Sequence, residues 1–376
     1  MQIRDYLPRL FRPPVYQGRQ NSSGYFEGWY FKLLDREGRH IWSFIPGVSY
    51  SSDPHSFVQV IHANSGQSRY HRYPVDAFTY DTRGFRVGIG PNSFSLQHLV
   101  VDLEDRDWRI SGKIILENTT PYPFRITAPG IMGWYSYVPM MECYHGVVSM
   151  QHDLRGSLQI NGEAVDFSGG KGYIEKDWGR SMPSDWIWIQ SNHFEKDDRA
   201  SFMISLARIP WMKGFFPGFL SFLYNDGQVH RFATYNRSRV THLGVDREEV
   251  RLKVENRRSQ LTVRALRREG GVLKAPRHGE MDREIRESII STVFVEMKDR
   301  GGRVLFSDRG RFAGLEIVSH NETPGLGGRI DEPAFKQQFR GFEIPSDGVV
   351  VRKASAEGTT PEGAVDGITG ATRTSD

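Results

Sequence analysis

The sequence predicts a mainly β fold of two antiparallel β-barrels or sandwiches packed together, followed by a flexible C-terminal tail. The chain has 376 residues, which fits two domains of roughly 100 to 200 residues each. It contains 39 glycines and 19 prolines, and 12% of its residues are aromatic. Short apolar and aromatic runs separated by turn residues are typical of antiparallel barrels and sandwiches rather than of alternating strands and helices.

The first half of the chain reads as a series of short strands. Segment 25–34, YFEGWYFKLL, opens the series, and the turn-like segments 35–39 and 63–67 that separate strands contain Gly, Asp, Asn or Ser. The strands expected in this half are 25–34, 40–45, 56–62, 94–101, 108–117, 146–150, 156–160 and 186–194.

The second half continues the pattern and adds one short helix, expected at 280–288. Charged segment 195–199 reads as a turn before a new set of strands, so the barrels are expected at 1–195 and 196–322. Residues 323–376 read as a linker and a flexible tail rich in small residues. The strands expected here are 201–208, 219–224, 228–236, 250–255, 260–266, 289–297 and 303–312.

Composition narrows the functional classes. The formal net charge of +4 is too small and too dispersed for a nucleic-acid-binding protein, so no nucleic-acid partner is expected. The chain has one cysteine, Cys143, which excludes an intrachain disulfide and any multi-cysteine metal site. The N-terminus lacks the apolar core of a signal peptide, and no apolar run is long enough to span a membrane. These features predict a cytoplasmic protein.

The first candidate site lies in YFEGWYFK, residues 25–32, where a carboxylate stands among aromatic residues. Strand alternation places Glu27 and Trp29 on one face and Tyr30 on the other. A buried Glu27 would need either a partner or a raised pKa, because desolvation penalises its charged form. The alternative is a surface or salt-bridged glutamate beside core aromatics.

Two further segments combine polar and aromatic residues. MECYHGVVSMQH, residues 141–152, brings Tyr144, His145 and His152 together, but no third ligand stands at a recognisable metal spacing, so no metal site is predicted. KGYIEKDWGRSMPSDWIWIQSNHF, residues 171–194, has acids among tryptophans and would line one wall of a pocket for a large apolar ligand. The alternative for that segment is an ordinary tryptophan-rich barrel core.

Three separated motifs together resemble the tocopherol cyclase family. They are YFEGWYFK, HGVVSMQHDLRGSL at 145–158, and GYIEKDWGRSMPSDWIWIQSNHF at 172–194, within a similarity that covers roughly residues 20–320. The resemblance implies two lipocalin-like β-barrels, with a pocket formed largely by barrel interiors. It also implies a cofactor-free reaction, in which a phenolic oxygen of a prenylated hydroquinone adds to the nearest prenyl double bond and closes a chromanol ring.

That reaction needs an acid for the alkene, a wall that stabilises a tertiary cation, and an acceptor for the phenol proton. Each role has candidates in this sequence, and the substrate implied is a prenylated aromatic or quinol. The acid is Asp177, Glu175 or Glu27, and Asp177→Asn is expected to abolish turnover while sparing ligand binding. The cation wall is assigned to Trp29, Trp178, Trp186 and Trp188, and the quinol head to His145, His152, Tyr144 or Asn192, with Tyr30 as a further binding residue.

Two features suggest further partners. The tail sequence DGITGAT, residues 366–372, is similar to the signal on which a flavin transferase attaches FMN, with Thr372 as the acceptor, although a small-residue tail without function is the alternative. Segment 209–224, IPWMKGFFPGFLSFLY, reads either as a peripheral membrane contact or as a buried strand with its turn. Two other functions fit the same features: a non-catalytic carrier of prenylquinones or other lipids, and a flavinylated quinone redox protein.

Overall fold

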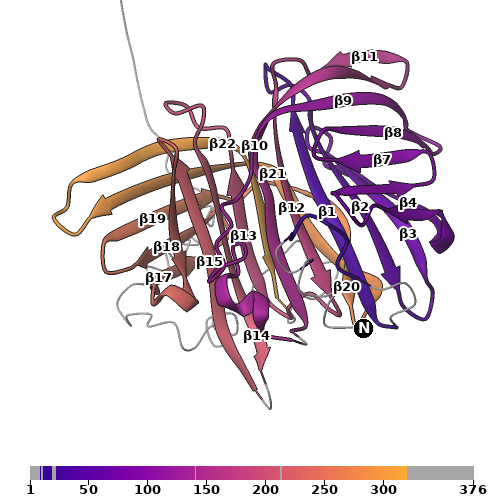
Figure 1. Cartoon of the computed structure of the whole chain (residues 1–376). Coiled ribbons are helices and arrows are strands. Elements are labelled where there is room, and N and C mark those ends of the chain that lie inside the picture. The colour runs from indigo at the N-terminus through magenta and orange to yellow at the C-terminus, as the bar shows by residue number, and fades with distance from the viewer. Residues whose placement is uncertain (1–8, 10–11, 19–22, 140, 212–213, 320–376) are drawn as a thin grey trace, which may run out of the picture.

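The computed structural model describes residues 9, 12–18, 23–139, 141–211 and 214–319, and they form two large antiparallel sheets (Figure 1). This confirms the predicted mainly β fold. The first sheet runs in the order β4-β3-β2-β1-β12-β10-β9-β8-β7-β6-β5, with β11 paired to β10. The second runs β16-β15-β14-β13-β22-β21-β19-β18-β17, with β20 paired to β21. No helix among the described residues is long and apolar enough to cross a membrane.

The first sheet contains twelve strands and two 3₁₀ turns. They are β1 (Tyr25–Leu34), β2 (Ile41–Tyr50), β3 (His55–His62), β4 (Gln67–Pro74), η1 (Val75–Ala77), β5 (Phe78–Tyr80), β6 (Arg86–Ile89), β7 (Asn92–Ser95), β8 (His98–Glu104), β9 (Arg109–Thr120), η2 (Gly133–Tyr137), β10 (Cys143–Ile160), β11 (Glu163–Asp166) and β12 (Lys171–Gly179).

The second sheet contains ten strands and one 3₁₀ turn. They are β13 (Trp186–Ser191), β14 (Ser201–Trp211), β15 (Gly214–Asn225), β16 (Gln228–Ala233), η3 (Thr234–Asn236), β17 (Arg239–Val245), β18 (Glu249–Glu255), β19 (Ser259–Leu266), β20 (Gly271–Arg277), β21 (Glu280–Asp299) and β22 (Val304–Val318). The change of sheet falls between Gly179 and Trp186, upstream of the domain change that the sequence placed after residue 195.

The predicted helix at 280–288 is wrong, because this segment is the first half of strand β21. Its side chains alternate with a period of two: Met281, Ile285 and Glu287 are buried, whereas Asp282, Glu284 and Arg286 are exposed. The high content of charged residues suggests a surface helix, but most of the charges lie on the exposed face of a strand, and Glu287 is buried on the other face.

Three apolar cores hold the molecule together. The interior of the first sheet is filled by a cluster that includes Trp29, Trp42 and Phe94, and the interior of the second by one that includes Phe202 and Val263. A third cluster lies between the sheets and includes the side chains Tyr30, Leu34, Ile41, Trp186, Trp188, Met203, Phe222 and Ile289. The outer face of β1 and β12 therefore packs against the second sheet.

Candidate functional site

The main cavity lies between the two sheets. Its walls come from β1–β3, β10 and β12 of the first sheet and from β13–β15 and β20–β22 of the second, together with η2 and η3. None of its lining residues belongs to the core of the first barrel. One lining residue, Phe219, belongs to the core of the second barrel. The cavity is therefore not formed largely by barrel interiors, as expected, but mainly between the sheets, because aromatic and branched side chains already fill the interiors.

Glu175 lies at the centre of the cavity wall on β12. Its Oε2 accepts hydrogen bonds from the hydroxyl of Tyr173 at 2.7 Å and from Nε1 of Trp188 at 3.2 Å. Burial raises the pKa of Glu175 to about 7, although the nearby His145 and these hydrogen bonds oppose the rise. The carboxyl group therefore keeps its proton to a higher pH than an exposed glutamate does, which suits a general acid.

His145 and Asp177 form a pair beside Glu175. They are direct partners across β10 and β12, and Nδ1 of His145 lies 2.9 Å from Oδ1 of Asp177. Burial would lower the pKa of His145, but the carboxylates of Asp177 and Glu175 outweigh it and raise that pKa to about 9. Nε2 of His145, which has no hydrogen bond to any described residue, lies 3.7 Å from Oε2 of Glu175. An imidazolium in this position stabilises the ionised form of Glu175.

Two further glutamates face the cavity from the second sheet, and sequence reasoning missed both. Glu287 on β21 and Glu316 on β22 are cross-strand partners. Glu287 accepts a hydrogen bond of 2.5 Å from the hydroxyl of Tyr30, and Glu316 accepts one of 2.5 Å from Nε1 of Trp186. Burial raises the pKa of Glu316 to about 8, and burial together with the neighbouring Glu316 raises the pKa of Glu287 well above its ordinary value.

The rest of the cavity wall is mainly apolar. Trp186 and Trp188 stand on one side, and Tyr30 packs edge-on against Trp188 with ring centroids 5.6 Å apart. The wall also includes Met132, Tyr135, Met141, Cys143, Met182, Ile209, Phe216 and Met281. Flexible thioethers and aromatic rings suit a large apolar ligand, while the carboxylates and His145 offer it a few polar contacts.

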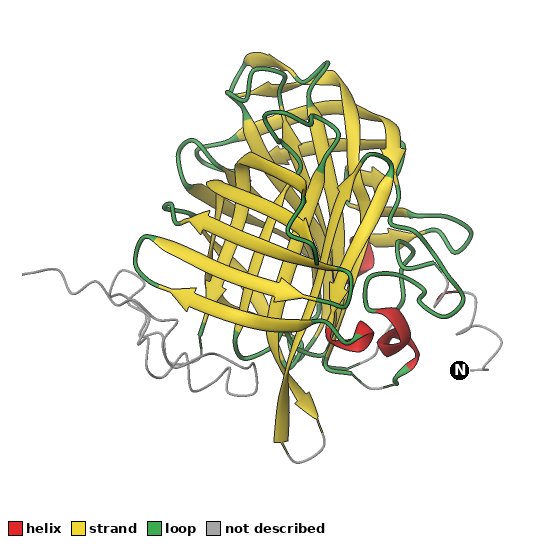
Figure 2. Ribbon diagram, turned by 90° about the vertical axis from the view of Figure 1, so that its left-hand side faces the viewer, coloured by secondary structure: helices red, strands yellow, loops and turns green. Residues whose placement is uncertain are grey.

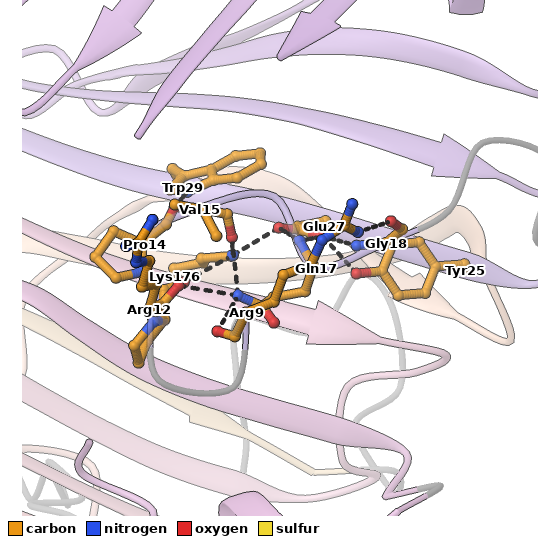
Figure 3. A network of polar contacts seen from close by, with 11 residues as sticks. Arg9, Arg12, Pro14, Val15, Gln17, Gly18, Tyr25, Glu27, Trp29 and Lys176 are labelled. Atoms are coloured by element: carbon orange, nitrogen blue, oxygen red, sulfur yellow. Dashed lines mark hydrogen bonds and ion pairs between the residues drawn. The ribbon is translucent and has the colours of Figure 1, made fainter. Parts of the chain in front are cut away.

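Glu27 does not line the cavity and instead holds the N-terminal segment against the first barrel (Figure 3). Its fully buried carboxylate lies 2.6 Å from Nζ of Lys176, which is also fully buried. Backbone N–H groups of Gln17 and Gly18 donate to the carboxylate at 2.8 to 3.0 Å. The hydroxyl of Tyr25 also donates to it. Because β1 alternates, Glu27 faces the barrel interior and Tyr30 faces the cavity. Glu27 therefore has partners of its own and no access to a ligand there.

Five other predicted site residues also lie outside the cavity lining. Nε1 of Trp29 donates to the carbonyl of Pro14 at 2.9 Å, and Trp178 stacks on Tyr144 at 5.5 Å between ring centroids. His152 contacts Ser149, and burial lowers its pKa to about 3. The amide nitrogen of Asn192 donates to the carbonyl of Gly172 at 2.9 Å. The structure thus brings together Asp177, Glu175, Tyr30, His145, Trp186 and Trp188 and separates Glu27, Trp29, Tyr144, His152, Trp178 and Asn192 from them.

The cluster also has the composition of a metal-ligand set. One ligand atom each from His145, Glu175 and Asp177 lies within 4.8 Å of the other two. Sequence spacing around the two histidines does not indicate this set, because His145 meets the two carboxylates only across paired strands. Nδ1 of His145 is already engaged by Asp177, so the arrangement as it stands is a hydrogen-bonded pair beside a carboxylic acid.

Two regions of the chain each match a known protein family. The family described as Tocopherol cyclase-like matches residues 122–319, and the family described as FMN-binding domain matches residues 301–376. A chloroplastic tocopherol cyclase of Zea mays is 32% identical over 62 residues, which cover 16% of this chain and 13% of that protein. One component of the Na⁺-translocating NADH-quinone reductase of Vibrio anguillarum is 35% identical over 72 residues, which cover 18% of this chain and 28% of that component.

Two solved structures align with this chain at low similarity. A candidate AttH protein of Nitrosomonas europaea has 13% identity and a TM-score of 0.48, with 80% of this chain and 94% of the other aligned. CghA, solved with Sch210972, also has 13% identity and a TM-score of 0.48, with 82% and 90% aligned. The aligned regions cover only a small part of the length of the curated relatives named above. The predicted flavin acceptor Thr372 and the rest of DGITGAT lie outside the described residues.

Proposed function

Because this chain belongs to the tocopherol cyclase-like family, we propose that it closes a ring on a prenylated aromatic by adding a phenol oxygen to a prenyl double bond. The observation that carries the proposal is Glu175, a buried carboxylic acid with a pKa of about 7 between Trp188 and the His145–Asp177 pair. The cavity around it is apolar enough for a prenyl chain. A carrier without turnover is the alternative for the same cavity.

The proposed cycle begins and ends with Glu175 protonated. The carboxyl group donates its proton to the less substituted alkene carbon, which leaves a tertiary cation on the neighbouring carbon. The rings of Trp186 and Trp188 face this cation, each contributing about 0.5 to 2 kcal/mol. The phenol oxygen then bonds to the cation, and its proton returns to the Glu175 carboxylate. His145, held by Asp177, stabilises that carboxylate while it is ionised.

The proposal is tested with the full-length protein and a prenylated benzoquinol under reducing conditions, with the chromanol measured by chromatography. Glu175→Gln is expected to lower turnover by about 10² to 10⁴ while ligand binding persists, because the amide keeps the shape but has no acidic proton. Glu163→Gln, at an exposed acid on β11, is the matched control. Binding without conversion by the wild-type protein would favour the carrier, and full turnover by Glu175→Gln would move the acid to Asp177.

A second function is favoured by the tail. The match of residues 301–376 to the FMN-binding domain includes DGITGAT, so we also propose that Thr372 accepts FMN from a flavin transferase. A bound flavin would supply electron transfer to a quinone. Coexpression with a transferase should give a coloured protein band that survives denaturing electrophoresis, and Thr372→Ala should remove the colour while Thr359→Ala, elsewhere in the tail, keeps it. A colourless wild-type protein in the presence of active transferase would contradict this assignment.

A further inference from the structure

Exposed apolar side chains gather at one end of the molecule. Eight large hydrophobic residues are exposed in the described part of the chain, and five of them come from the connector 121–139 and from strand β15. Ile126 is 76% exposed and Trp134 is 48% exposed, which is unusual for side chains of this size in a water-facing position. We call these five residues the apolar rim: Phe124, Ile126, Trp134, Tyr137 and Phe215.

The segments that carry the apolar rim also contribute to the cavity wall. Met132 and Tyr135 of the connector line the cavity, as do Ile209 of β14 and Phe216 of β15. The connector and the β14–β15 hairpin touch through the rings of Tyr135 and Phe216, whose centroids are 6.1 Å apart. The β14–β15 hairpin projects beyond both sheets, and the 3₁₀ turns η2 and η3 lie beside its base (Figures 1 and 2). The same two segments therefore expose apolar groups outward and line the cavity inward.

The charge of the two segments that carry the apolar rim indicates what kind of surface would bind them. Neither 121–139 nor 209–224 contains a single Asp or Glu, although these two residue types number 45 in the whole chain. Arg125 is exposed between Phe124 and Ile126. Trp134 and Tyr137 belong to the residue types that concentrate where hydrocarbon meets lipid headgroups. An apolar face with aromatic residues, a cation and no carboxylate complements an anionic lipid surface.

We propose that the apolar rim docks on the interface of an anionic lipid bilayer, with the end of the cavity turned toward the lipid. Ile126, Trp134 and Phe215 insert among the headgroups and upper acyl chains, and Arg125 pairs with lipid phosphates. A lipophilic ligand then enters the cavity between the connector and the hairpin without crossing water. The docking does not depend on the proposed ring closure, since vesicle binding is measured without turnover.

The test is co-sedimentation of the full chain with phosphatidylglycerol–phosphatidylcholine vesicles. Each exposed apolar side chain that inserts contributes on the order of tenfold to partitioning, so Ile126→Ser with Trp134→Ser should weaken vesicle binding by at least about tenfold. The matched control is Val304→Ser with Leu305→Ser, which removes exposed apolar side chains from β22 outside the apolar rim and should leave binding unchanged. Arg125→Ser should weaken binding to anionic vesicles about fivefold and leave binding to pure phosphatidylcholine unchanged.

Three results would overturn the proposal. The first is a wild-type protein that stays in the supernatant with anionic vesicles, and the second is equal loss of binding in the rim and control variants. The third is concentration-dependent dimerisation in sedimentation velocity that the rim variants abolish, because the same face would then be an interface between two copies of the chain. Circular dichroism of each variant establishes that the fold is retained before any of these results is interpreted.

Discussion

Individual buried carboxyl groups at the cavity make the stability of the folded protein depend on pH. Glu287 is 1% exposed and accepts a hydrogen bond from Tyr30. Burial and the neighbouring Glu316 raise its pKa well above the ordinary 4.5, and the hydrogen bond from Tyr30 only partly opposes this rise. As pH rises above about 4.5, the unfolded chain loses this proton while the folded protein keeps it, so Glu287 makes the protein less stable at higher pH.

Glu287→Gln should therefore flatten the decrease in stability between pH 5 and pH 7. One such proton corresponds to a slope of up to about 1.4 kcal/mol per pH unit, and the amide still accepts the hydrogen bond from Tyr30. Lys32, whose pKa burial lowers to about 7, stays mostly protonated near pH 5 and begins to lose its proton toward pH 7, where it opposes the slope. Urea unfolding at both pH values measures the change, and Glu284→Gln, exposed on the same strand, is the control. Equal slopes in wild type and Glu287→Gln would show that this group keeps its ordinary pKa.

At the scale of elements, β12 carries two different chemistries on its two faces. Glu175 and Asp177 face the cavity, whereas Lys176 between them faces the first barrel. Nζ of Lys176 donates to the carbonyls of Pro13 and Val15 at 2.9 and 2.6 Å, besides its ion pair with Glu27. The N-terminal segment and β12 are thus joined through one buried ammonium group.

Lys176→Met should destabilise the protein by about 3 to 5 kcal/mol, because it leaves the Glu27 carboxylate buried without its counter-charge. Glu27→Gln should also lower stability, yet the folded fraction should retain its turnover, since Glu27 has no contact with the cavity. Chemical unfolding and activity per folded molecule measure the two effects, with Lys113→Met at an exposed lysine of β9 as the control. A large loss of turnover in folded Glu27→Gln would return this residue to the catalytic candidates.

The sequence predicts many of the strands but misses others, among them β12, which carries Glu175 and Asp177. It predicts the site only in part, and the reason is physical. Alternation along a strand is local, so segment 25–34 and the tryptophans of 186–191 are readable from the chain itself. Which face becomes the cavity wall depends on the packing of two sheets, and that is set by partners distant in sequence. Glu287 meets Tyr30 across 257 positions, and the charges of its segment favour a helix. The apolar residues Met281 and Ile285 are four positions apart, a spacing that fits a helix as well as a strand, so the local sequence reveals neither the strand nor the role of Glu287.

At the scale of the whole molecule, the two sheets share a core. The cluster between them includes Leu34 and Ile41 of the first sheet and Met203 and Phe222 of the second. Polar contacts also cross this interface, since Nζ of Lys32 donates to Gln190 at 3.0 Å and to the carbonyl of Phe312 at 2.5 Å. Separating the sheets would expose both the apolar cluster and a buried lysine. We therefore expect the two sheets to unfold as one unit rather than as independent domains.

Leu103→Ala tests this cooperativity from a position outside the interface. Leu103 is fully buried inside the first barrel, and its truncation should cost about 2 to 5 kcal/mol through lost burial and the cavity it leaves. If the two sheets unfold as one cooperative unit, this loss of stability also lowers the protection of backbone amides in the second sheet against hydrogen exchange through global unfolding. Hydrogen exchange under conditions of global unfolding should then accelerate equally in β2–β3 and in β18–β19. Leu261→Ala, in the core of the second barrel, should give the reciprocal result. If exchange accelerates only in the mutated sheet, the sheets unfold separately and the contact between them does not bind them into one folding unit.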